Sequence, residues 1–173
     1  GTDDIRPFHL VKALAQFTVA LVSANSKYDK VKRGEEKAVF TNQEANGLKL
    51  FTKFCASCHK PPFFASDDFK SNGLPIDTEL LDFGRMTITG NKRDSLLFMV
   101  PTLRNIEYSF PYMHDGSISS LEDVIEHYSK GGNKHPLQHK NIVEFKISSS
   151  EKKQLVSFLK SLTDTSYIQR MNF

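Results

Sequence analysis

The feature that most constrains this sequence is the pentapeptide Cys55-Ala56-Ser57-Cys58-His59, which holds the only two cysteines of the chain. Two thiols separated by two residues and followed by an imidazole form the attachment signal for c-type haem. One helical turn then presents both sulfur atoms to one edge of the porphyrin, where they form thioethers, and the imidazole binds the iron. The pentapeptide therefore predicts one covalent haem c per chain, held by Cys55, Cys58 and His59.

Three other interpretations of the pentapeptide are weaker. A thioredoxin-like pair should follow a strand in a βαβ pattern, which the flanking sequence lacks. A structural zinc site usually draws on more cysteines than the two present. The third interpretation is that the pattern of two cysteines and a histidine arose by chance. Because haem is normally attached outside the cytoplasmic membrane, we expect a periplasmic protein, and because the chain begins with Gly1 rather than Met, we expect it to be processed.

Length and charge exclude several classes of protein. A chain of 173 residues suits one domain with an adequate core. The net charge is only +3, from 23 Lys and Arg against 20 Asp and Glu, and the basic residues are scattered, which argues against nucleic-acid binding. The longest apolar stretch, from Leu10 to Val22, is too short and too polar for a membrane span.

Hydrophobic periodicity predicts a mostly helical chain. Apolar residues recur every three or four positions from Asp4 to Ala24, as in an amphipathic helix. Residues 27–36 are charged and are interpreted as a solvated linker. The capping box from Thr41 to Glu44 begins a helix that leads into the haem motif. Two more helices are predicted, at Ser120–Tyr128 and Ser148–Leu162.

Residues 60–98 are rich in Pro, Gly, Asn and Asp and show no sustained periodicity. A loop of this length in a compact domain needs something to wrap, and a porphyrin is suitable. A helix before the haem motif, loops around the ring and a closing helix packed on the first describe an all-α, class I cytochrome c-like domain with long haem-wrapping loops. We assign residues 1–173 to one such domain, with a leading helix at 1–26 and a haem-binding core at 41–173.

A series of further motifs lies along the chain: Ala13-Leu14-Ala15-Gln16-Phe17, Leu21-Val22-Ser23-Ala24-Asn25-Ser26, Gly47-Leu48-Lys49-Leu50-Phe51, Asp82-Phe83-Gly84-Arg85, Val100-Pro101-Thr102-Leu103-Arg104-Asn105, Pro111-Tyr112-Met113-His114-Asp115-Gly116 and Leu121-Glu122-Asp123-Val124. In this order the set resembles the bacterial diheme cytochrome c peroxidases, specifically their second, C-terminal haem domain. The resemblance covers nearly the whole chain, and the ordered set is far more specific than any one motif.

The resemblance implies an oxidoreductase in which this domain receives electrons from a small donor protein and passes them to a second haem that reduces hydrogen peroxide. Family members carry that second haem domain and a tryptophan between the haems, whereas this chain has one Cys-x-x-Cys-His and no Trp. We therefore interpret the chain as half of a peroxidase, with a homodimer as an assembly to test. The alternative is a stand-alone monohaem electron carrier.

The candidates for the sixth iron ligand are Met86, Met99, Met113, His114 and Tyr128. Spacing from His59 favours Met113, although a methionine also fills irregular gaps in a core. The resemblance favours Tyr128, which occupies the position of the ligand methionine of the peroxidases. A tyrosine there is similar to the diheme enzyme of methylamine utilisation, which oxidises a protein substrate, and a phenolate would lower the potential of the iron. Tyr128 is our first choice and Met113 our second.

Four other residues receive roles as ligand contacts. Arg85 and Arg104 could form charge-assisted hydrogen bonds with haem propionates, or ion pairs with carboxylates of the protein. The resemblance implies that the backbone carbonyls of Ser109 and Pro111 help to hold a calcium ion between the two domains. The remaining protein ligand would come from the other half, so we expect weak calcium binding by this chain alone.

Overall fold

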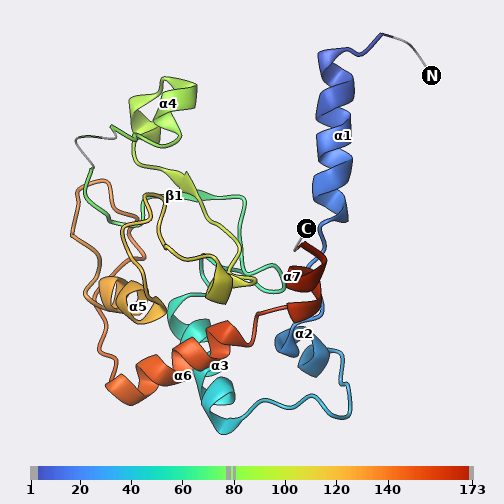
Figure 1. Cartoon of the computed structure of the whole chain (residues 1–173). Coiled ribbons are helices and arrows are strands. Elements are labelled where there is room, and N and C mark those ends of the chain that lie inside the picture. Colours follow the sequence, from blue (N-terminus) through green and yellow to red (C-terminus); the bar gives the residue numbers. More distant parts are fainter. Residues whose placement is uncertain (1–3, 77–78, 80, 172–173) are drawn as a thin grey trace.

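The computed structural model describes residues 4–76, 79 and 81–171, and it confirms the predicted helical class (Figure 1). Its helices are α1 (Pro7–Ala20), α2 (Lys27–Lys32), α3 (Asn42–Phe54), α4 (Met86–Thr89), α5 (Leu121–Ser129), α6 (Ser149–Lys160) and α7 (Thr165–Met171). Short 3-10 helices cover Lys92–Asp94 and Ile106–Tyr108, and strands β1 (Phe69–Lys70) and β2 (Phe98–Met99) pair in antiparallel orientation.

The core lies where α3 crosses α6, which confirms the predicted packing of the closing helix on the helix before the haem motif. Phe51 of α3 and Phe158 of α6 are fully buried, with ring centroids 5.1 Å apart. Gly47 allows the helices to approach this closely, because a Cβ atom there would lie 2.0 Å from the carbonyl oxygen of Gln154. Helix α5 packs on α6 and extends the same core.

Local capping fixes where the core helices begin. The Thr41 hydroxyl accepts from the Glu44 amide, and the Glu44 carboxylate accepts from the Thr41 amide, so the predicted capping box is confirmed. Ser148 and Glu151 form the same reciprocal pair at α6. Each box satisfies backbone donors that the first helical turn leaves without partners.

The described residues between 60 and 98 form the expected long loop, with a few short elements inside it. Strand β1 pairs with β2 so that Phe69 faces Met99 and Lys70 faces Phe98. Helix α4 ends at Gly90, whose φ of 67° is the left-handed conformation that favours glycine at a helix end. These elements were not predicted, because strands of two residues leave no detectable period in a sequence.

The leading segment differs from the prediction in two ways. The predicted helix over 4–24 is shorter, at Pro7–Ala20, and within the described residues none of its side chains is buried. Residues 27–36 are not simply a solvated linker: Ser26 caps α2, and Tyr28 and Asp29 are buried. Residues 1–3 of the predicted leading segment lie outside the described residues.

In the described part of the chain, every helix is too short or too polar to cross a bilayer.

Candidate haem site

Helix α3 delivers the haem motif. It ends at Phe54, and the chain continues in a tight turn in which the Cys55 carbonyl accepts from the amides of Cys58 and His59 at 3.1 and 3.0 Å. Both thiols are half-buried, and the structure joins neither to another described cysteine. The turn therefore presents two reduced sulfur atoms beside one imidazole, as thioether attachment requires.

The ring of His59 is held from one side by two backbone carbonyls. Its Nδ1 lies 3.2 Å from the Phe64 oxygen and 3.1 Å from the Pro101 oxygen. A carbonyl only accepts, so the hydrogen is on Nδ1 and Nε2 keeps its lone pair for a metal. Burial lowers the pKa of His59, with partial compensation from the two carbonyls, so the imidazole is in the neutral form that binds iron.

Tyr128 lies near the two thiols and, like them, is half-buried. Burial raises the pKa of its hydroxyl, and the nearby Cys55 and Cys58 raise it further. Burial likewise raises the pKa of Cys55 to about 12, with a contribution from Cys58. Tyr128 is on α5 and the thiols follow α3, so the packing of the two helices on α6 brings these three side chains together.

Met113 is connected to the same region through Asn72. The Asn72 amide donates to the Met113 sulfur at 3.6 Å, and the backbone carbonyl of Asn72 accepts from His127 Nε2 at 2.9 Å. The His127 ring packs edge-on against Tyr128, with centroids 5.1 Å apart. Asn72 and His127 were missed by the sequence analysis, because no motif connects a loop residue to a helical histidine 55 positions later.

The other three candidates for the sixth ligand have different surroundings. His114 stacks on Phe98 with centroids 3.7 Å apart. Met99 is 60% exposed in β2. Met86 is the first residue of α4, in the part of the long loop between the two strands. Tyr128 differs from these three in lying near both thiols, which raise the pKa of its hydroxyl.

Both candidate arginines are engaged by carboxylates of the protein. Arg104 forms a two-point ion pair with Asp29, both distances being 2.8 Å, and also donates to the Pro62 carbonyl. Arg85 lies 3.6 Å from Asp94. These contacts correspond to the ion-pair alternative, and the pairing of either guanidinium with a haem propionate stays a prediction.

The two residues predicted to bind calcium lie on the surface. Ser109 and Pro111 are exposed, and the peptide bond before Pro111 is cis. Among the described residues, no three His, Cys, Asp or Glu side chains are grouped to hold a metal ion. Calcium at the Ser109 and Pro111 carbonyls therefore stays a prediction.

The donor set fits haem c. Two unbridged thiols lie one turn apart, the neighbouring imidazole has Nε2 free, and Tyr128 or Met113 is available for the sixth position. Cys55 and Ala56 of the motif pack against the hydrophobic core, so the motif lies beside apolar side chains, which suits a porphyrin face.

Comparisons with known proteins identify the family of the chain. The Cytochrome c family model matches residues 44–163. The chain is 34% identical to a cytochrome c551 peroxidase of Nitrosomonas europaea, over 94% of this chain and 46% of the relative. It is 36% identical to the methylamine utilization protein MauG of Methylorubrum extorquens, over 89% of this chain and 44% of the relative.

A solved structure of a MauG-like protein associated with microbial copper homeostasis shares the fold, with TM-score 0.77 and 34% identity over 84% of this chain and 50% of that protein. The chain thus spans about half the length of the relatives it matches, and it corresponds to their C-terminal region. Since the family model covers most of the sequence and includes the thiols and the imidazole, the chain belongs to the cytochrome c family.

Proposed function

We propose that this chain is the electron-transfer domain of a two-haem, peroxidase-like oxidoreductase, residues 1–173 forming one haem domain. It would take electrons from a small donor protein and pass them to a second haem domain, where one H2O2, two electrons and two protons give two waters. The observation that carries the proposal is His59: its Nδ1 is held by two carbonyls beside two reduced thiols. The likeness to half of a cytochrome c peroxidase supports it.

Haem c would supply a one-electron couple between ferric and ferrous iron. Cys55 and Cys58 would hold it covalently, and His59 would bind from the α3 side with its orientation fixed by the Phe64 and Pro101 carbonyls. With a sixth position filled from the protein, the site would be closed to peroxide, so this domain alone should transfer electrons and not cleave the oxidant.

For the sixth position we favour Tyr128 over Met113. Tyr128 lies near both thiols, whereas the Met113 sulfur already accepts a hydrogen bond from Asn72. A phenolate is a hard ligand that stabilises oxidised iron, while a thioether raises the potential. Tyrosine ligation favours a second candidate function: oxidation of a protein substrate by a two-haem enzyme, which the 36% identity to MauG also supports.

Three finer features belong to the same proposal. Covalent haem attachment and the peroxidase relative support a periplasmic location. The exposed position of Ser109 and Pro111 suits a calcium ion shared with another domain. The electron donor would be a small redox protein that approaches the haem of this domain.

The test is maturation with the haem-attachment machinery. We expect a red protein whose mass exceeds that of the polypeptide by one haem, while the variant with Cys55→Ser and Cys58→Ser stays colourless. The reduced chain alone should be oxidised slowly by H2O2, and the full gene product rapidly. A matured chain without haem, or equal oxidation rates for the two proteins, would contradict the proposal.

A further inference from the structure

We infer that the apolar face of α1 and the groove at its base form one docking surface, and that its occupant is the haem domain preceding the matched region in the longer relatives. This inference rests on the proposed function, because it takes the chain to be the C-terminal half of a two-domain protein. It adds α1 and the groove at its base to the contact between the domains, which the resemblance places only at Ser109 and Pro111.

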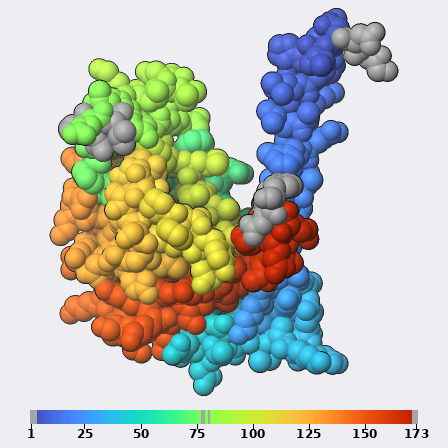
Figure 2. Space-filling model, in the orientation of Figure 1, coloured from blue at the N-terminus to red at the C-terminus, as the bar shows by residue number. Residues whose placement is uncertain are grey.

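Helix α1 projects away from the rest of the molecule (Figure 2). Its apolar side chains are largely exposed: Phe8 52%, Leu10 60%, Val11 65%, Leu14 55%, Phe17 53% and Val19 77%. On a helical wheel Leu10, Val11, Leu14 and Phe17 occupy one stripe, opposite His9, Lys12 and Gln16, while Phe8 and Val19 lie at the edge of the polar side. A helix of 14 residues is only marginally stable in water without a packed face. The stripe therefore needs a partner beyond the described residues.

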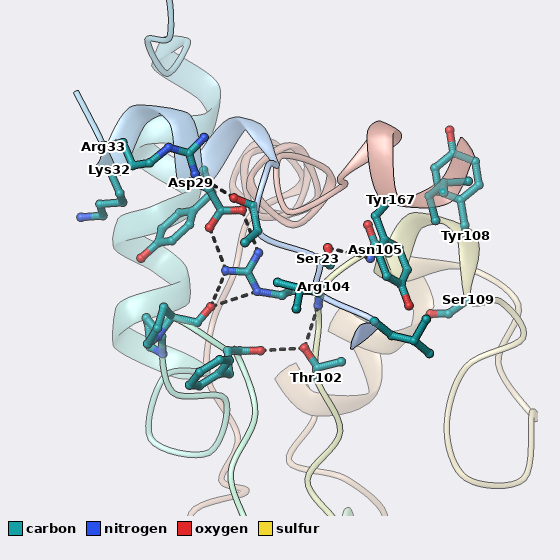
Figure 3. Close-up of a pocket in the computed structure, with 18 residues that line it drawn as sticks. Ser23, Asp29, Lys32, Arg33, Thr102, Arg104, Asn105, Tyr108, Ser109 and Tyr167 are labelled. Carbon is teal, nitrogen blue, oxygen red and sulfur yellow. Dashed lines mark hydrogen bonds and ion pairs between the residues drawn. The ribbon is translucent and has the colours of Figure 1, made fainter. Parts of the chain in front are cut away.

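A groove of about 1050 Å³ opens at the base of α1 (Figure 3). Leu21 and Val22, which directly follow α1, line it, so the groove continues the apolar face. It is also lined by Phe63 and Tyr108, which are 72% and 56% exposed. Exposed aromatic side chains around a largely apolar hollow are typical of interface anchors.

Ion pairs and hydrogen bonds hold the groove in shape. Arg104 lies in it, fixed by Asp29 and by the Pro62 carbonyl. The buried Asp164 carboxylate accepts from the amides of Asn25 and Tyr167, both at 2.9 Å, and so joins the segment after α1 to α7. The surface is therefore formed before a partner binds, which lowers the entropic cost of docking.

The groove lies one loop away from the proximal histidine. Pro61, Pro62 and Phe63 line it, and the next residue, Phe64, gives a carbonyl to His59. Thr102, which also lines the groove, donates to the Phe63 carbonyl at 2.6 Å and follows Pro101, the second carbonyl partner of His59. A domain seated here would touch both segments that orient the imidazole, which suits electron transfer between two haems.

The occupant follows from the relatives' architecture. The matched region is C-terminal in the relatives, so their additional half joins the matched region at the end where α1 lies. A domain attached at α1 has a high effective concentration at this surface. A membrane is a poorer occupant, since helices that bind bilayers carry a polar face rich in Lys and Arg, whereas α1 has Lys12 as its one basic residue apart from His9.

Hydrogen–deuterium exchange tests the inference on two haem-loaded proteins: the full gene product, with whatever precedes residue 1, and the 173-residue chain. We expect α1 amides to exchange at least about tenfold more slowly in the full product, with protection also at 61–63 and 102–109. Leu14→Asp in the full product should restore fast exchange, and Gln16→Asp, the same charge on the polar side of α1, should not.

Equal exchange of α1 in the two proteins overturns the inference, whether or not Leu14→Asp folds. The inference is also overturned if α1 is protected in the 173-residue chain and that chain sediments as a dimer. Binding of the 173-residue chain to phosphatidylglycerol vesicles would overturn it as well. Failure of the proposed function gives a different result, absence of haem absorption bands. Fast electron transfer between the two haems, with the α1 amides still exchanging rapidly, would refute this docking surface and leave the proposed function standing.

Discussion

Asp29 and Arg104 form a two-point ion pair, with both nitrogen–oxygen distances at 2.8 Å and side chains only 10% and 9% exposed. The pair joins α2 to the segment that follows Pro101, whose carbonyl accepts from the His59 imidazole. Burial raises the pKa of Asp29, but hydrogen bonds from Arg104 and Ser26 outweigh burial and lower it to about 2. Residues that were expected to lie in a linker and at a haem propionate thus stabilise the fold together.

The first prediction concerns acid stability. The folded-state pKa of Asp29 lies below its ordinary 3.8, so its stabilisation is present above about pH 4 and is lost as the pH falls to about 2. That contribution is roughly 2 kcal/mol. Asp29→Asn should lower the free energy of unfolding at pH 7 and flatten its pH dependence between 4 and 2. Urea titrations at several pH values measure both, and the exposed Asp67→Asn is the control that should change neither.

The second prediction concerns the sixth ligand. Tyr128→Phe should change the absorption and spin state of the ferric haem, because a hard phenolate is removed from the iron. Met113→Leu, of similar volume, should leave the spectrum unchanged. The opposite pattern would make Met113 the ligand.

The third prediction concerns the crossing of α3 and α6. Gly47→Ala would place a Cβ atom 2.0 Å from the Gln154 backbone oxygen, which cannot move aside as a flexible side chain could. We expect destabilisation of about 3 kcal/mol or more, the upper range for overpacking in a core. Thermal unfolding measures it. Lys49→Ala, on the exposed side of α3, should cost less than 1 kcal/mol.

The fourth prediction concerns the start of α3. Thr41→Ala removes the hydroxyl that accepts from the Glu44 amide and should cost about 1 kcal/mol. Thr41→Ser keeps the acceptor and should retain most of the stability. Chemical denaturation compares the two, and equal losses would show that the cap contributes little.

What could be predicted from the sequence was mostly local. The capping boxes at Thr41 and Ser148 identify helix starts because their hydrogen bonds join residues three positions apart. The haem motif is equally local. Helix α2 was missed although Ser26 and Asp29 form a capping pair, because the surrounding lysines give the segment the composition of a solvated loop.

The rest depends on contacts between distant residues. Arg104 meets Asp29 across 75 positions, and His127 meets Asn72 across 55, and no spacing rule predicts either pair. Periodicity predicted the apolar stripe of α1, but a stripe does not reveal whether its partner lies in the same domain. The environment that distinguishes Tyr128 from Met113 arises only when α5 packs on α6.

Phe64 contributes both to the aromatic core and to the support of the His59 imidazole. Its ring is fully buried beside Phe51, while its carbonyl accepts from the His59 imidazole, in a backbone with φ of 53°. Any loosening of the aromatic interior would therefore reach the His59 imidazole, the proposed iron ligand, through one residue. The midpoint reduction potential of the haem-loaded protein, measured during gentle warming, should therefore change before circular dichroism records any loss of helix.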